Sequence, residues 1–148
     1  MTTALQSPKT LRSLPASLFV SVYADFLKKS GRIELPSWLN IVKTGIGKQH
    51  APENVNWFYY RLAALARKFY LNRGKGVGNL RKEYGCKKRN GSRPSKKVIS
   101  SGKILRFGLQ QLERLNIIYK NRKGERKITK KAKQDMDNRA LKIMSSIE

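Results

Sequence analysis

The chain has 148 residues, with 33 Lys and Arg against nine Asp and Glu, and a formal net charge of +24. It has one cysteine and one histidine, which excludes an intramolecular disulfide and a Cys/His zinc cluster. No apolar run approaches the roughly 20 residues that span a bilayer, and no cleavable leader opens the chain. We therefore expect a soluble, intracellular protein with no membrane partner.

The positive charge is concentrated in the second half of the chain. Residues 61–133 hold 24 of the Lys and Arg residues and three of the acids, a net charge of +21. A folded domain with that charge repels itself, so a polyanion is the expected counterion and nucleic acid is the leading candidate. Leucines and aromatics are spread through the same stretch, which predicts a folded basic domain instead of a disordered tail.

The length suits one domain. Residues 1–12 read as a flexible N-terminal end, and residues 13–148 as a single domain. A first helix is predicted from Pro15, which suits a first helical turn, to Gly31, which suits a C-cap. An extended piece over 32–35 precedes a short helix capped by Ser37, which carries Trp38, Leu39 and Val42. Residues 45–53 read as a loop.

A long central helix is predicted over residues 57–71, with Asn56 as its N-cap. Phe58, Leu62, Leu65 and Phe69 fall on one stripe of this helix. Small and apolar residues on its other sides indicate packing on more than one face. Its three cations lie in different places: Arg61 and Lys68 share one edge of the stripe, and Arg67 projects nearly opposite its centre.

Glycines at 74, 76 and 78 then interrupt the chain, and residues 79–84 could form one short helical segment. Residues 86–97 contain six Lys and Arg and no acid. Asn90-Gly91 and Pro94 mark turns within them. This composition predicts a long surface loop that faces phosphates.

The next helix is predicted from a cap at Ser100 or Ser101 to about residue 116. Leu105, Leu109 and Leu112 form its apolar stripe, and the opposite face presents Lys103, Arg106, Gln110 and Arg114.

A β-hairpin follows over 117–128, with Gly124 in its turn. Thr129 caps a last helix, which bears Ala132, Met136, Ala140 and Ile143 on one side. The pattern predicts a mainly α, winged helix-turn-helix-like domain with a small β-hairpin wing and flanking N- and C-terminal helices.

Catalytic and cofactor motifs find little support. The glycine run 74–78 follows a helix, lacks the dinucleotide spacing and is not closed by Gly-Lys-Ser/Thr. His50 has no evident nucleophile partner, and Asp135 and Asp137, two residues apart on a helix, do not face each other. We therefore expect no enzyme activity, no cofactor, no metal and no small-molecule substrate.

A set of motifs spread over residues 15–140 resembles one protein family. Upstream are Phe26-Leu27-Lys28-Lys29-Ser30-Gly31 and Pro36-x-Trp38. The central block comprises Asn56-Trp57-Phe58-Tyr59, Arg61, Ala66-Arg67, Tyr70-Leu71, Gly74 to Gly78, Lys82, Tyr84-Gly85, Arg89-Asn90-Gly91 and Pro94. Arg106, Leu109-Gln110, Leu112-Glu113, Gly124, Arg126, Thr129 and Asp137 complete it. In this order they resemble the eukaryotic and archaeal S19e family of small-subunit ribosomal proteins.

The resemblance implies a compact, mostly helical, winged-helix-type structural protein in the head of the small ribosomal subunit. It implies binding to small-subunit ribosomal RNA, contacts with neighbouring small-subunit proteins and a contribution to pre-ribosomal RNA maturation and subunit assembly. It also implies cytoplasmic ribosomes, with nuclear and nucleolar passage in a eukaryote. The expected RNA-binding residues, from the family motif and the charge pattern, are Arg61, Arg67, Lys68, Arg73, Lys75, Gly76, Lys82, Lys87, Lys88, Arg89, Asn90, Arg93, Lys96, Lys97, Lys103 and Arg106.

Some positions depart from the family pattern. Lys96 occupies the place of a usual histidine, Glu125 replaces a glycine at the wing tip and Ala132 replaces a late glycine. These changes affect local contacts only.

The sequence also allows a different function, that of a winged-helix DNA-binding regulator. In that case the face formed by Lys103, Arg106, Gln110 and Arg114 would enter a major groove. The spread of charge over several elements argues against it.

Overall fold

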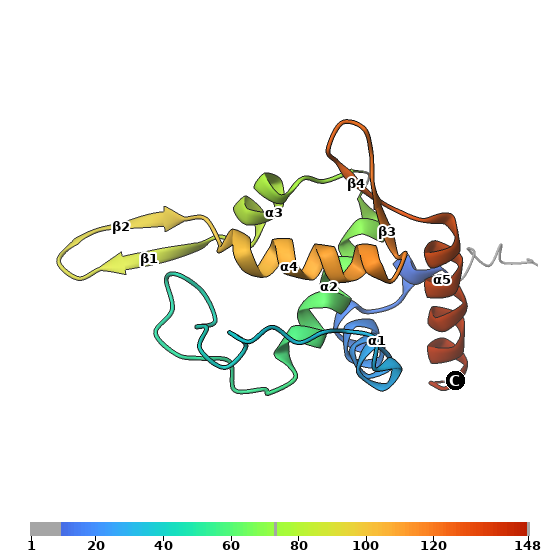
Figure 1. Ribbon diagram of the computed structural model, residues 1–148. Helices are drawn as coiled ribbons and strands as arrows, with labels where there is room; N and C mark the ends of the chain where they lie inside the picture. Colours follow the sequence, from blue (N-terminus) through green and yellow to red (C-terminus); the bar gives the residue numbers. More distant parts are fainter. Residues whose placement is uncertain (1–9, 73, 148) are drawn as a thin grey trace, which may run out of the picture.

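The computed structural model describes residues 10–72 and 74–147. Within these residues the chain forms five α-helices, one short 3-10 helix and two antiparallel hairpins (Figure 1). The elements are η1 (Leu11–Ser13), α1 (Ala16–Ser30), α2 (Trp57–Leu71), α3 (Val77–Glu83), β1 (Cys86–Asn90), β2 (Arg93–Val98), α4 (Gly102–Arg114), β3 (Ile118–Lys120), β4 (Arg126–Ile128) and α5 (Lys130–Ser145). The mainly helical class predicted from the sequence is confirmed.

Helix α2 lies at the centre of the core, as its apolar stripe predicts. It packs against α1, α4 and β4, and Phe58, Leu62 and Leu65 are wholly buried. Helix α4 approaches closely because Gly108 has no side chain: a Cβ there would lie 3.2 Å from Cδ2 of Leu62. The predicted leucine stripe of α4 is also confirmed, since Leu105, Leu109 and Leu112 are buried.

Helices α1 and α5 lie beside this central pair (Figure 1). Helix α1 ends as expected at Gly31, whose φ of 62° places it in the left-handed region that glycine tolerates. The predicted cap of α5 is confirmed: Oγ1 of Thr129 accepts a 3.2 Å hydrogen bond from the Ala132 amide. The predicted inner face of α5 is buried.

The N-terminal boundary differs from the sequence prediction. Residues 10–12, assigned to a flexible end, include Leu11, which is wholly buried in the core. Its amide donates a 3.1 Å hydrogen bond to Oδ1 of Asp137 on α5. The rest of that predicted end, residues 1–9, lies outside the described residues.

The largest correction concerns residues 86–97, which are a β-hairpin and not a loop. Strands β1 and β2 pair in antiparallel fashion from Cys86 opposite Val98 to Asn90 opposite Arg93, with a register shift between Lys88 and Asn90. The strands are exposed along almost their whole length, so they lack the apolar alternation by which strands are recognised. Backbone pairing and the turn, not burial, define this element.

The predicted short helix at 38–42 is also wrong. The chain there makes single turns, in which the amide of Leu39 donates to the Pro36 carbonyl at 3.1 Å and the Ile41 amide to the Trp38 carbonyl at 3.2 Å. So short a segment gains few helical hydrogen bonds for the cost of nucleation. Trp38 is instead held by α4, edge-on to Phe107 with ring centres 5.7 Å apart.

The N-cap positions predicted for α2 and α4 are confirmed, but the capping hydrogen bonds expected from their side chains are not. Asn56 and Ser101 occupy the N-cap positions, yet neither side chain makes the capping hydrogen bond. The second hairpin, in contrast, is confirmed, with Ile118 opposite Ile128 and Lys120 opposite Arg126. The segment after α2 joins its edge, where Lys75 and Arg126 exchange two backbone hydrogen bonds of 3.2 Å.

Candidate nucleic-acid interface

The hairpin β1–β2 projects from the body of the molecule, on the side away from α5 (Figure 1). Its register sets Lys87 opposite Lys97 and Lys88 opposite Lys96, and all four side chains are exposed. We call these four residues the lysine ladder. Like charges directly opposite each other destabilise a pair of strands. The hairpin therefore carries an electrostatic cost that a bound polyanion would remove.

The tip of this hairpin combines a structural residue with further cations. The side-chain amide of Asn90 donates a 3.2 Å hydrogen bond to the Pro94 carbonyl, and Gly91 supplies the positive φ, 70°, that the turn requires. Arg89 and Arg93 are exposed beside it. Asn90 thus shapes the turn, and the two arginines leave their guanidinium groups accessible to a ligand.

The outer face of α4 forms a second cationic surface. Lys103, Arg106, Gln110 and Arg114 are exposed, opposite the buried leucine stripe, as the helical spacing predicts. Arg114 makes an exposed ion pair with Glu34. Near the start of the helix two guanidinium groups converge: a Cβ on Gly102 would lie 2.9 Å from Nη1 of Arg106 and 3.3 Å from Cδ of Arg81.

Three of the predicted contact residues share partners at the end of α3, and a fourth, Lys103, has its Nζ atom 5.6 Å from the Trp38 ring centre. Arg61 lies over the Tyr84 ring at 4.4 Å, and Nζ of Lys68 lies 4.2 Å from the same ring centre. Lys68 also pairs with Glu83 at 2.6 Å, and Lys75 forms an ion pair with that carboxylate. Hydrogen bonds from Lys68 and Lys75 lower the pKa of Glu83. This cluster fastens α3 to α2.

Arg67 is not as exposed as its place in the helical pattern predicts. It is half-buried, and its Nε atom is enclosed without a hydrogen-bond partner among the described residues. The reason is the central position of α2, which has neighbours on several sides. A ligand reaching Arg67 would meet the outer end of the guanidinium only.

The remaining predicted residues lie around α3. Lys82 is exposed on that helix, and half-buried Gly76 is its N-cap residue. Arg73 lies outside the described residues. The structure thus brings the exposed candidates into two groups, one on the hairpin and one on α3 and α4, and uses Arg61, Lys68 and Lys75 for internal packing.

Sequence reasoning missed the contact that joins α3 to the segment leading into α4. The Nε atom of Arg81 donates a 2.9 Å hydrogen bond to the Ser100 carbonyl, and the Ser100 amide donates one of 3.0 Å to the Arg81 carbonyl. These bonds connect α3 to the start of α4 across the base of the hairpin. They pair residues 19 positions apart, and nothing in the local pattern indicates that pairing.

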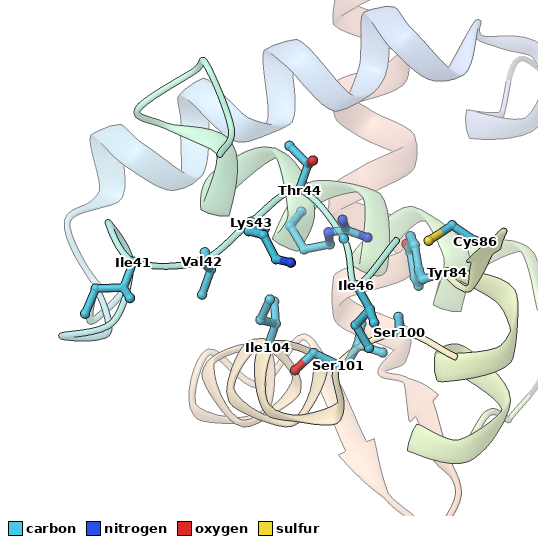
Figure 2. A pocket seen from close by; sticks show the side chains of 13 residues that line it. Ile41, Val42, Lys43, Thr44, Ile46, Tyr84, Cys86, Ser100, Ser101 and Ile104 are labelled. Carbon is cyan, nitrogen blue, oxygen red and sulfur yellow. The ribbon is translucent and has the colours of Figure 1, made fainter. Parts of the chain in front are cut away.

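A pocket of about 320 Å³ lies at the base of the hairpin (Figure 2). The segment 41–46 forms one wall, and Tyr84, Cys86 and Ile104 belong to the opposite walls. Gly47 holds this segment against β1, since a Cβ there would lie 2.9 Å from both Sγ of Cys86 and the Lys87 carbonyl oxygen. The packing fixes the direction in which the hairpin leaves the body.

Within residues 10–72 and 74–147, no group of three or more His, Cys, Asp or Glu side chains could hold a metal ion. No helix in the part of the chain that the structure describes is both long and apolar enough to cross a membrane.

Comparison with known proteins places the chain in a family. The family model described as "Ribosomal protein S19e" matches residues 10–146. The small ribosomal subunit protein eS19 of Entamoeba histolytica is 44% identical over 138 residues, covering 93% of this chain and 88% of that protein. The eS19 of Oryza sativa is also 44% identical, with 91% and 92% covered, and eS19A of Saccharomyces cerevisiae is 38% identical, with 94% and 97% covered.

The helical core and its cationic extensions therefore belong to a structural protein of the ribosome, a class without enzymatic activity. Within that class the chain belongs to the ribosomal protein S19e family, the eS19 proteins of the small subunit. The resemblance seen in the sequence motifs is confirmed over nearly the whole described chain.

Proposed function

We propose that this protein is a structural constituent of the head of the small ribosomal subunit, where it binds small-subunit ribosomal RNA. The observation that carries the proposal is the lysine ladder: Lys87 faces Lys97 and Lys88 faces Lys96 on a projecting hairpin. Such a ladder is unfavourable in the free protein and favourable against phosphates. Membership of the S19e family supports ribosomal RNA as that polyanion.

The proposed RNA surface has two parts. The first is the hairpin, with the lysine ladder, Arg89, Asn90 and Arg93. The second is the outer side of α3 and α4, where Lys82, Lys103 and Arg106 are exposed. Backbone amides at a helix N-terminus favour anions, and Arg81 and Arg106 both lie near the start of α4. We propose that the main role of Arg61, Lys68 and Lys75 is to position α3, and that any contact of theirs with RNA contributes less.

Recognition by these surfaces depends on phosphate position and RNA shape. The major groove of A-form RNA is too narrow for a helix such as α4, so base reading in a duplex is not expected. Each phosphate that a cation neutralises releases counterions, so affinity falls with rising salt. The contribution of the protein is therefore to hold RNA segments in a fixed arrangement.

We further infer a winged-helix arrangement, with α2, α3 and α4 as the three-helix unit and β3–β4 as the wing. Contacts of α4 with α2, α3 and β3 support it. The hairpin β1–β2 is then an insertion between the second and third helices of the unit. The proposal also includes neighbouring small-subunit proteins as partners, a part in pre-ribosomal RNA maturation and subunit assembly, and cytoplasmic ribosomes reached after nuclear assembly in a eukaryote.

Sedimentation tests the proposed function. A tagged copy of the full chain is expressed in cells, and lysates are run on sucrose gradients at increasing salt. We expect the protein to co-sediment with small subunits and to remain bound at moderate salt, and crosslinking to recover small-subunit ribosomal RNA. Recovery only in free or chromatin fractions would contradict the proposal, and the chromatin result would favour the DNA-binding alternative.

A further inference from the structure

A separate cavity lies at the C-terminal end of α2 and shares none of the described residues that line the pocket at the hairpin base. Its volume is about 290 Å³, close to the roughly 300 Å³ at which small-ligand sites begin. It is formed where the end of α2, Gly74, the hairpin β3–β4, α5 and the segment before α1 meet. Among the residues that the structure describes, none of the RNA-binding residues predicted from the sequence lines it.

An accessible aromatic ring belongs to one wall. The register of β3–β4 pairs Tyr119 with Lys127 and Ile118 with Ile128. Because side chains alternate along a strand, Ile118 faces the core, where it is 2% exposed, and Tyr119 faces away, with 48% of its surface exposed. Tyr119 and Lys127 both line the cavity. An exposed ring beside a cavity is the arrangement on which proteins stack unpaired bases.

Three cations from separate elements line the same cavity: Arg12, Lys127 and Lys133. None of them makes an ion pair with another residue of the described ranges. Nζ of Lys133 lies 5.5 Å from the ring centre of Tyr70, which also lines the cavity. Two carboxylates lie nearby. Oδ1 of Asp137 already accepts hydrogen bonds from Tyr70 and Leu11, and Oε2 of Glu125 lies 2.8 Å from the position of a Cβ on Gly74, so the three cations outnumber them. The cavity is therefore suited to an anion.

We propose that this cavity binds one unpaired nucleotide of the small-subunit ribosomal RNA. The base stacks on the exposed ring of Tyr119, and the phosphate lies among the three cations. An acidic protein segment would satisfy the cations but would leave the exposed ring without a matching group, so the observations favour RNA. This site deepens the RNA-binding function proposed above and rests on it.

Short ribonucleotides test this site directly. The full chain is titrated with a single-stranded uridine hexanucleotide and with a hexamer of abasic ribose phosphates, at one fixed salt concentration. For Tyr119→Leu we expect roughly tenfold weaker binding of the uridine hexamer, the scale of one lost stacking contact, and unchanged binding of the abasic one. Tyr119→Phe keeps the stacking surface and should bind both as the unaltered chain does.

Two further variants separate the phosphate from the base. Lys133→Gln should weaken both hexamers to a similar extent, whereas Lys123→Gln, exposed on the turn beyond the cavity, should change neither by more than about twofold. A 4-thiouridine hexamer should crosslink to a peptide that contains Tyr119.

Two results would overturn the proposal. One is that Tyr119→Leu binds the uridine hexamer as tightly as the unaltered chain does, and the other is that crosslinks are confined to other peptides. If hexaglutamate binding requires Lys133 and uridine hexamer binding is unaffected by Tyr119→Leu, the cavity binds an acidic protein segment instead.

The two proposals fail in distinguishable ways. If the unaltered chain sediments with small subunits but the Tyr119 variants bind uridine as it does, the nucleotide site is wrong and the ribosomal function stands. If the unaltered chain does not sediment with small subunits, the broader function is wrong whatever the hexamers show.

Discussion

The hydroxyl of Tyr70, near the end of α2, donates a 2.7 Å hydrogen bond to Oδ1 of Asp137, on α5. The same oxygen accepts a 3.1 Å bond from the Leu11 amide. Burial first, and then the bond to Asp137, raise the pKa of Tyr70 to about 12. One carboxylate thus joins the N-terminal segment, the central helix and the last helix.

Removing this carboxylate should loosen all three elements together. Hydrogen bonds to a charged group contribute about 1.5–3 kcal/mol each when well enclosed. Since Asp137 is only half-buried, we expect Asp137→Ala to lower the free energy of unfolding by about 2–3 kcal/mol in urea denaturation. Asp137→Asn retains an acceptor oxygen and should lose less. Asp135→Ala, at an exposed site on the same helix, is the control and should stay within about 0.5 kcal/mol; equal losses at both positions would contradict this role.

The Glu83 cluster predicts a specific response to acid. Lys68 and Lys75 lower the pKa of Glu83 below its ordinary value of 4.5, so the folded state holds the charged form more strongly than the unfolded state does. The resulting stabilisation is present above about pH 4.5 and is lost as pH falls through the lowered value. Glu83→Gln should therefore be less stable than the unaltered chain at neutral pH, and the gap should close in strong acid.

Thermal unfolding at several pH values measures this gap. The ion pairs are partly exposed, so added salt should also narrow it. Glu53→Gln, an exposed position in the loop before α2, serves as the control. A difference between Glu83→Gln and the unaltered chain that stayed constant from neutral pH to strong acid would show that the charge of Glu83 is not what stabilises the fold.

The buried face of α4 predicts a severe core defect. Leu109 is wholly buried between the helices, and Leu109→Asp would place an unpaired charge there, at a cost of about 3–5 kcal/mol or more. That is comparable with the whole stability of many domains, about 5–15 kcal/mol, so we expect an unfolded chain by circular dichroism. Gln110→Asp, one residue on and exposed, should remain folded. A normal melting curve for Leu109→Asp would reject the position of α4.

Sequence patterns predicted the elements that bury a face. Phe58, Leu62 and Leu65 on α2 and Leu105, Leu109 and Leu112 on α4 recur at helical spacing because the core selects them. The same reasoning fails for β1 and β2, whose side chains are exposed and follow no apolar period. The Asn90-Gly91 dipeptide was the available signal, since that pair favours tight hairpin turns, but without alternating flanks it indicated only a turn.

The sequence predicted which basic residues the candidate site contains, but only partly which of them are exposed to a ligand. The basic face of α4 follows from helical spacing, and it is exposed as expected. The contact of Arg61 with Tyr84 and the pairing of Lys68 with Glu83 depend on how α3 folds back on α2, which no local pattern encodes. Arg67 illustrates the same limit: because it is half-buried, a charge reversal there would disturb folding and RNA binding together, so the exposed lysine ladder is the better target.

The most direct test of the proposed function replaces Lys87, Lys88, Lys96 and Lys97 together with glutamine in the full chain. We expect the variant to melt at the same temperature as the unaltered chain or a higher one, because the like-charge pairs are gone. Its recovery in small subunits on a sucrose gradient should fall at least tenfold. A matched variant with Lys28, Lys29, Lys131 and Lys142 changed to glutamine, outside the proposed surface, should incorporate normally. Undiminished incorporation of the hairpin variant would show that this hairpin does not bind ribosomal RNA.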